Sequence, residues 1–147
     1  MIRQANTGDI SRISEILVFT KRVNYRRIFH NDEYSFGELQ VLSVARELEA
    51  YPERLTEIWV FEERFVKGLI RIREWEVAEL YVDSFFSGQG IGGKLLDFAV
   101  DRFDVRNLWV LEENPRANAF YERHGFRNSG IRKYEEGTTQ RLLWMER

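Results

Sequence analysis

Apolar positions recur with two different periods along this chain, and the period separates helices from strands. Residues 1–5 predict a short first strand. Thr7 is the predicted N-cap of the helix that follows, with Asp9 in its first turn, where a carboxylate interacts favourably with the helix dipole. The buried face of this helix is predicted from the apolar spacing of Ile10, Ile13, Ile16, Leu17 and Thr20.

A polar and aromatic stretch, residues 24–36, follows this helix. Ser35 and Glu38 then form a capping-box pattern, which indicates the start of a second amphipathic helix. Its apolar face is predicted to carry Leu39, Leu42, Ala45 and Leu48. The helix is expected to end near Pro52.

The middle of the chain has the period of strands. Residues 57–63, 65–73 and 76–82 are short β-rich runs joined by tight charged turns, which is typical of an antiparallel meander. A glycine-rich stretch and a third helix come next, and this helix is predicted to bury Ile91, Leu95, Phe98 and Ala99 on one face.

The last part of the chain carries the clearest boundary signals. Residues 107–111 predict a buried strand. Asn114 as N-cap, Pro115 at the first helical position and Gly125 after the end bracket a fourth helix. Residues 126–136 and 138–147 predict a terminal hairpin that turns at Gly137. The predicted order is β-α-α-β-β-β-α-β-α-β-β. It indicates an α/β (α+β) fold with a mixed, mostly antiparallel central sheet and helices on both faces.

Composition narrows the class of protein. The 147 residues suit one domain, residues 1–147, and the formal net charge of −2 gives no electrostatic reason to expect a nucleic-acid partner. The sequence has no cysteine, which excludes a cysteine nucleophile, and its two histidines, His30 and His124, lack metal-ligand spacing. We expect no metal, no membrane association and a cytoplasmic protein, since no signal-peptide or membrane-spanning pattern occurs.

Four glycines fall within six residues at Gly88, Gly90, Gly92 and Gly93, directly before the third helix. Such a loop can direct backbone N–H groups and the positive end of the helix dipole towards an anion, and pyrophosphate suits that geometry. Close helix–strand packing is the alternative explanation. The stretch lacks the Ser or Thr of a P-loop after Lys94, and Leu95 replaces the third glycine of a dinucleotide-binding turn.

Two motifs resemble those of the GNAT N-acetyltransferase family. Ser87-Gly88-Gln89-Gly90-Ile91-Gly92 is similar to the family's coenzyme A signature, Gln/Arg-x-x-Gly-x-Gly/Ala, with Ser87 in place of Gln or Arg. Residues 114–126 resemble the family's later Asn-x-x-Ala-x-x-Phe-Tyr-x-x-x-Gly-Phe segment. The element order also matches that family. The resemblance implies a GNAT-like fold and transfer of an acetyl group from acetyl-CoA to a primary amine by direct attack.

The resemblance assigns the catalytic roles. The backbone N–H of Val82 would polarise the thioester carbonyl, and Tyr121 would protonate the departing thiolate. Glu76 and Glu79, three residues apart on one strand, are the two candidates for the general base, with Glu79 slightly preferred. On an ideal strand they would face opposite sides, and a bulge would re-aim one of them. Each of these side chains has a simpler structural explanation, in packing or solvation.

The same resemblance implies a cosubstrate site made of Leu80, Tyr81, Val82, Ser87, Gly88, Gln89, Gly90, Ile91, Gly92, Gly93, Lys94, Asn114, Ala117 and Tyr121. Helix capping alone would also explain Asn114. The acceptor, a small-molecule or peptide amine, is expected to bind beside residues 24–36, where aromatic rings and arginines alternate: Tyr25, Arg26, Arg27, Phe29, Tyr34 and Phe36. A homodimer is compatible with the sequence. A non-catalytic acyl-CoA sensor or interaction module is the alternative function.

Overall fold

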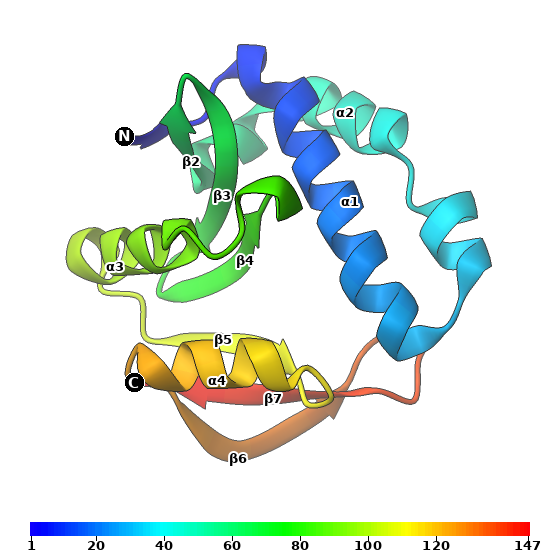
Figure 1. The fold of residues 1–147 in the computed structure, drawn as a ribbon, viewed down its shortest axis with the longest axis vertical. Coiled ribbons are helices and arrows are strands. Elements are labelled where there is room, and N and C mark those ends of the chain that lie inside the picture. Colours follow the sequence, from blue (N-terminus) through cyan, green and yellow to red (C-terminus); the bar gives the residue numbers. More distant parts are fainter.

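The computed structural model describes the backbone of residues 1–147 and the side chains of residues 1–26 and 30–147. A seven-stranded sheet runs through the molecule in the order β1-β2-β3-β4-β5-β7-β6, and β4 and β5 are its only parallel neighbours. The strands are β1 (Ile2–Gln4), β2 (Ile58–Glu63), β3 (Phe65–Arg73), β4 (Glu76–Val82), β5 (Asn107–Leu111), β6 (Arg127–Tyr134) and β7 (Arg141–Glu146). The predicted mixed, mostly antiparallel sheet is confirmed (Figure 1).

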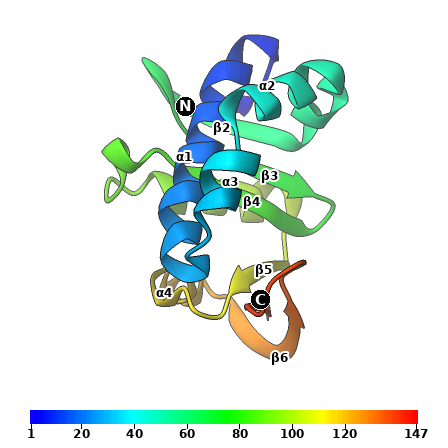
Figure 2. The same ribbon diagram turned by 90° about the vertical axis from the view of Figure 1, so that its right-hand side faces the viewer.

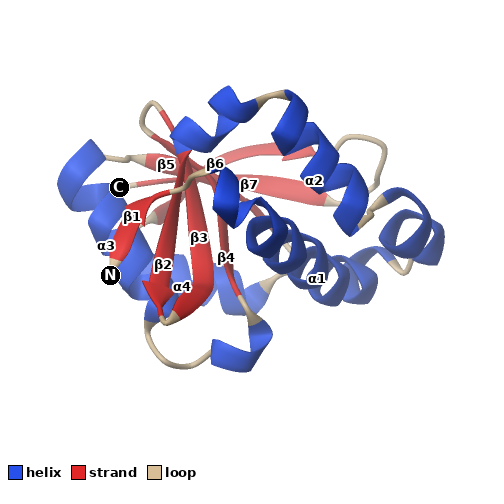
Figure 3. Cartoon of the chain, turned by 90° about the horizontal axis from the view of Figure 1, so that it is seen from above, coloured by secondary structure: helices blue, strands red, loops and turns tan.

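Helices cover both faces of the sheet, as predicted (Figure 3). The four α-helices are α1 (Ile10–Phe29), α2 (Val41–Ala50), α3 (Ile91–Phe103) and α4 (Pro115–Arg123). Four shorter helical turns are η1 (Thr7–Asp9), η2 (Glu33–Glu38), η3 (Pro52–Glu57) and η4 (Ser84–Phe86). Two clusters of buried side chains lie on opposite faces. Ile13 and Ile16 of α1 pack on Leu69 of β3, whereas Leu95 and Ala99 of α3 pack with residues such as Ile70.

Several predicted boundaries are confirmed. The meander and the β5 strand lie where the apolar runs indicated. The Asn114 side chain caps α4 by accepting a 3.1 Å hydrogen bond from the N–H of Ala117, with Pro115 at the first helical position. The terminal hairpin turns at Gly137, which has a φ of +75° that suits glycine. None of the described helices is long and apolar enough to cross a bilayer.

The cap of the first helical segment is a correction. Asn6, not Thr7, is the N-cap, because its side chain accepts a hydrogen bond from the N–H of Gly8 while Asp9 accepts one from the N–H of Asn6. Thr7 is the first residue of the 3₁₀ turn that precedes α1. Asn6 is the better cap because its carboxamide oxygen reaches the amide two residues on.

The boundary between α1 and α2 is the second correction. Helix α1 continues to Phe29, and Ser35 and Glu38 form no capping box, since both lie in the π-helical turn η2. Helix α2 begins only at Val41. A tertiary contact explains the difference: Arg22 of α1 donates to the carbonyls of Ser35 and Leu39 at 2.9 and 3.0 Å, which ties η2 to α1.

Strands β4 and β5 pair over only two positions, Glu76 with Asn107 and Val77 with Leu108, and then separate. The chain leaves β4 through η4 and returns as α3. The amino half of the sheet and the β5-β7-β6 half therefore diverge along β4. The carboxyl end of β4 is left without a neighbour on one edge.

Candidate active site

A cavity of about 730 Å³ opens where β4 and β5 diverge. It is lined by the end of β4, the glycine-rich loop, the first turns of α3, one side of α4 and the middle of α1. Figure 2 shows α1 crossing the sheet towards the level of α4. Segments from positions 20 to 124 of the sequence thus enclose one space.

The glycine-rich loop forms the cavity wall through its backbone. Gly88 and Gly90 both have a φ of +78°, a conformation that other residues rarely adopt. Helix α3 has no side-chain cap, and the N–H of Lys94 donates to the carbonyl of Gly90 at 3.1 Å. The N–H groups of the first turn are therefore left for an anion, at the positive end of the helix dipole.

Ser87 contributes little to this wall through its side chain. Its hydroxyl donates a 3.0 Å hydrogen bond to the carbonyl of Ser84, which closes the η4 turn. A longer Gln or Arg side chain at this position would project from the loop, whereas the serine is bound back to it. The loop consequently offers backbone amides and no cation at position 87.

The free edge of β4 supplies further backbone groups. The N–H of Asp83 donates to the carbonyl of Lys67 on β3 at 2.9 Å. Since successive N–H groups of an extended strand point to opposite edges, the N–H of Val82 points away from β3, towards the gap left by β5. Leu80 has the same orientation two residues earlier. The side chains of Leu80 and Val82 also line the cavity.

Tyr121 lies on the side of α4 that faces the cavity. Its ring packs edge-on against Phe120 and Phe126, with centroids 5.1 and 6.0 Å away. Burial raises the pKa of the Tyr121 phenol above its usual value of 10, so that the group stays protonated at neutral pH. Among the described side chains its hydroxyl has no hydrogen-bond partner, and it can donate to a bound molecule.

The two candidate bases lie outside the cavity lining, on β4. Arg71 of β3 pairs with Glu79 and Arg73 with Glu76, so Ala78 is part of a bulge between them. Arg71 and Arg73 are two residues apart and share a face of the sheet, so their partners share it too. The bulge has therefore placed Glu76 and Glu79 on one face, the face of α1. Glu79 lies in the part of β4 that has left β5, whereas Glu76 lies in the paired part.

Every predicted cosubstrate residue lines the cavity except Tyr81 and Gln89. Tyr81 pairs with Leu69 and packs in the cluster beneath α1. Burial raises the pKa of Tyr81 well above 10, with additional contributions from Glu79, Tyr25 and Tyr121. Tyr81 therefore lies next to Glu79 on the α1 face.

Other residues reach the cavity that the sequence patterns did not indicate. Helix α1 contributes Thr20, Val23 and Asn24, helix α4 adds Arg116, Phe120 and Arg123, and His124 follows the end of α4. The three α1 residues are spaced i, i+3 and i+4, which places them on one helix face. That spacing was a signal in the sequence, but it does not reveal which segment the face meets.

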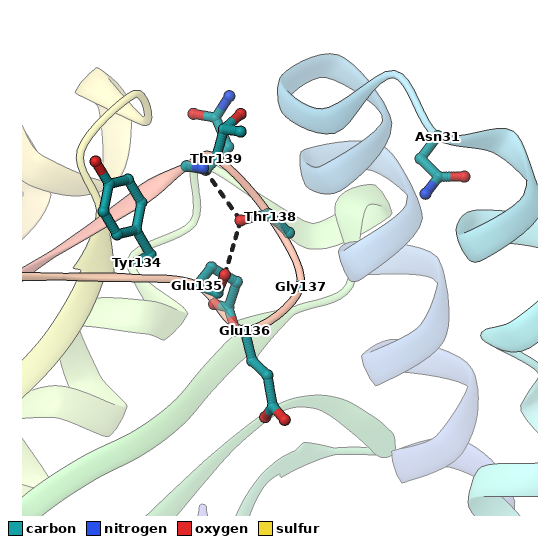
Figure 4. A pocket seen from close by; sticks show the side chains of 8 residues that line it. Asn31, Tyr134, Glu135, Glu136, Gly137, Thr138 and Thr139 are labelled. Atoms are coloured by element: carbon teal, nitrogen blue, oxygen red, sulfur yellow. Dashed lines mark hydrogen bonds between the residues drawn. The ribbon is translucent and has the colours of Figure 1, made fainter.

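A second cavity, of about 640 Å³, lies at the tip of the β6–β7 hairpin and is lined by Asn31 and residues 134–140 (Figure 4). Thr138 shapes the tip, since its hydroxyl donates to the carbonyl of Glu135 at 2.9 Å and accepts from the N–H of Gln140 at 3.1 Å. Tyr25 and Tyr34 stack nearby with centroids 6.2 Å apart. Burial raises the pKa of both phenols, and Glu135 adds to the effect.

The other acceptor candidates are partly described. Phe36 is half exposed and lies beneath the guanidinium groups of Arg22 and Arg26, at 5.3 and 5.6 Å from its ring centroid. Arg26 also pairs with Asp32 at 2.8 Å. The side chains of Arg27 and Phe29 lie outside the described residues. No group of three or more His, Asp or Glu side chains that could hold a metal occurs among the described residues.

Comparison with known proteins agrees with this geometry. The family model described as acetyltransferase (GNAT) domain matches residues 54–128, just over half of the chain. This chain belongs to the GNAT acetyltransferase family. The match covers the β2–β3–β4 meander, the glycine-rich loop and all of α4. The cavity's loop and its Tyr121 are thus GNAT elements.

A curated GNAT relative and two solved structures are similar to this chain. An uncharacterized N-acetyltransferase of Methanocaldococcus jannaschii is 38% identical over 63 residues, which are 40% of this chain and 28% of that protein. The coenzyme A complex of PaiA N-acetyltransferase from Thermoplasma acidophilum has a TM-score of 0.72 at 20% identity, covering 100% of this chain and 98% of the other. YncA from Salmonella typhimurium, with acetyl-CoA, has a TM-score of 0.69 at 20% identity, covering 100% and 92%. At these identities the two structures show the GNAT fold.

Proposed function

We propose that residues 1–147 form one GNAT domain that transfers an acetyl group from acetyl-CoA to a primary amine. The observation that carries the proposal is a single cavity joining the uncapped first turn of α3 to the buried phenol of Tyr121. The loop would bind pyrophosphate, and the free edge of β4 would bind the extended pantetheine arm alongside Leu80 and Val82.

The transfer needs one bond to form and one to break. The amine nitrogen attacks the thioester carbonyl, the carbon–nitrogen bond forms, and the carbon–sulfur bond breaks as the thiolate leaves. The N–H of Val82 would stabilise the negative charge on the carbonyl oxygen, because it is fixed and points into the gap beside β4. The absence of cysteine from the sequence supports direct transfer without a thiol acyl-enzyme.

Two proton transfers complete the reaction. Tyr121 would donate its phenolic proton to the leaving sulfur, since a phenol is protonated at neutral pH and this hydroxyl has no partner among the described side chains. Glu79 would take the proton that the ammonium group loses before or during attack, directly or through water. Glu79 is favoured over Glu76 because it lies where β4 has separated from β5.

The acceptor amine would approach from the α1 face of β4. Tyr25 and Tyr34 stack there, and Glu135 of the β6–β7 hairpin acts electrostatically on both. This arrangement supports a small-molecule or peptide amine entering between the carboxyl end of α1 and the hairpin tip. The stacked rings would pack on the carbon chain of that amine.

Release of free thiol from acetyl-CoA, followed with a chromogenic thiol reagent and a panel of amines, tests the proposal. The expected result is thiol release that depends on one class of amine, with the acetylated amine detected by mass spectrometry. Binding of coenzyme A without amine-dependent release from any amine class would favour an acyl-CoA sensor. Absence of coenzyme A binding would refute both functions.

A further inference from the structure

The cavity beside the glycine-rich loop carries three basic side chains that form no ion pair with another described residue. Among the described side chains, those of Lys94, Arg116 and Arg123 make no hydrogen bond and no ion pair. By contrast, Arg12 and Arg71 each bind carboxylates within 3 Å. The cavity lining therefore has an excess of positive charge, as expected for a polyanionic ligand.

The basic groups of α4 lie at its two ends. Arg116 follows the first residue of the helix and Arg123 is its last residue. Seven residues at 1.5 Å each separate them by about 10 Å along the helix axis. Because they lie at opposite ends of the helix, each is considered separately.

The end of α4 that carries Arg123 adjoins the glycine-rich loop. His124 follows Arg123, and its ring lies so close to Gly93 that a Cβ added there would be 3.1 Å from the imidazole Cε1. Gly93 belongs to the uncapped first turn of α3. A second phosphate group at Arg123 would therefore lie beside a pyrophosphate bound at that turn.

The His124 ring lies between one carboxylate and one aromatic ring. Asp97 of α3 lies 3.4 Å from its Nδ1 and is the only carboxylate among the described residues that line the cavity. Phe120 packs on the ring with centroids 4.7 Å apart. Asp97 lies on the Nδ1 side of the ring, whereas the Nε2 side faces Gly93 of the glycine-rich loop.

We infer that Arg123, with His124 beside it, binds the 3′-phosphate of coenzyme A and makes the site discriminate against dephospho-coenzyme A. The inference rests on the proposed function in one respect, that coenzyme A occupies this cavity. A phosphomonoester carries nearly two negative charges at neutral pH, and a guanidinium group can bind it through two parallel hydrogen bonds. The side chain that recognises the 3′-phosphate would therefore come from α4. Ser87 of the loop offers only a hydroxyl, and this hydroxyl already donates to the carbonyl of Ser84.

Calorimetric titration of the whole chain with coenzyme A and with dephospho-coenzyme A tests the inference. These ligands differ only in the 3′-phosphate. The wild-type protein should bind dephospho-coenzyme A more weakly by on the order of tenfold, the size of one charge-assisted hydrogen-bonded contact. The ratio of the two dissociation constants should fall as salt is added, because the contact is near the surface.

Variants separate the 3′-phosphate contact from general effects of charge. Arg123→Ala should weaken coenzyme A binding by about tenfold and leave dephospho-coenzyme A within twofold, so that the ratio falls towards one. His124→Gln should lower the ratio in part. Arg116→Ala, which removes an equal charge from the other end of α4, should leave the ratio unchanged. Arg46→Ala, an exposed charge on α2, controls for net charge.

The outcomes distinguish the inference from the proposed function. Equal affinity of the wild-type protein for both ligands overturns the inference and leaves the proposed function intact. If Arg123→Ala or His124→Gln has the same ratio of the two dissociation constants as the wild-type protein, the role of that residue is overturned. Failure to bind either ligand overturns the proposed function. Melting curves of the variants exclude misfolding as the cause of weaker binding. An Arg123→Lys variant, which keeps the positive charge, should retain part of the preference for coenzyme A.

Discussion

The guanidinium group of Arg71 donates a 3.4 Å hydrogen bond to the carboxylate of Glu79, which lies directly opposite it on the neighbouring strand. A second bond, from Nε of Arg71 to Glu57 at 2.7 Å, fixes the guanidinium from the other side. This chain of charges holds Glu79 on the α1 face, where Tyr81 and Tyr25 are within electrostatic reach. The carboxylate proposed as base is therefore oriented by the sheet.

The first prediction compares the two candidate bases. Glu79→Gln should lower kcat by roughly 10²-fold near neutral pH, because the ammonium group then loses its proton acceptor. Glu76→Gln should change kcat by less than about threefold. Steady-state kinetics with the best amine of the panel, from pH 6 to 9, measures both. A larger loss in Glu76→Gln would reverse the assignment.

The second prediction tests Tyr121 as the proton donor. Tyr121→Phe should keep coenzyme A affinity within a few-fold and lower kcat by roughly 10²-fold, since the ring packing remains and the proton is lost. The loss should shrink with an acyl donor whose leaving group needs less protonation. Equal kcat in mutant and wild type would remove Tyr121 from the mechanism.

The third prediction separates strain in the glycine-rich loop from ligand exclusion. Gly90→Ala should destabilise the fold by about 1 kcal/mol, because alanine disfavours a positive φ, and should also abolish coenzyme A binding. Gly130 of β6 has a similar φ of +86° and open space at its Cβ position, so Gly130→Ala matches the strain away from the cavity. Calorimetric titration of both variants with the same series of coenzyme A concentrations compares their affinities. Similar affinities in the two variants would place the pyrophosphate elsewhere.

The fourth prediction concerns the residue at which the loop departs from the family motif. Ser87→Gln should tighten coenzyme A binding by no more than about tenfold, because it adds a side-chain hydrogen bond to a site made of amides. The gain should be the same for dephospho-coenzyme A, since pyrophosphate is common to both ligands. Weaker binding in this variant would mean that position 87 does not face the ligand.

The fifth prediction uses the pH dependence of stability. Hydrogen bonds from Arg3, at 2.8 and 2.9 Å, lower the pKa of Asp9 below its ordinary 3.8, although burial opposes this. A lowered pKa in the folded state means that the stabilisation is complete above pH 4 and is lost as the pH falls through the folded-state value. Asp9→Asn should therefore cost about 2 kcal/mol at pH 7.

Urea denaturation at pH 7 and at pH 3 measures this difference. The gap between Asp9→Asn and wild type should narrow at the lower pH. Asp104→Asn is the control, since the exposed pair of Asp104 with Arg106 should have little effect at either pH. A gap that stays constant with pH would mean that Asp9 acts through packing alone.

Local chemistry determined much of the fold from the sequence. The cap at Asn114, the turn at Gly137 and the positive φ of Gly88 and Gly90 each depend on a few neighbouring residues. The element order could likewise be predicted from the spacing of apolar residues. Side chains on one face recur every second residue in a strand and every three or four residues in a helix. The glycine-rich loop and Tyr121 could be identified as site candidates for the same reason.

Tertiary structure decided how these parts meet. Alternation along an ideal strand separates Glu76 from Glu79, and only the pairing of β4 with β3 creates the bulge that unites them on one face. Helix α1 continues into the stretch 24–36, and its Arg22 binds the η2 turn at Ser35. Arg123 and His124 meet Gly93 only when α4 packs beside α3. Short-range signals cannot specify these contacts, because each one joins segments whose approach depends on the packing of the whole sheet.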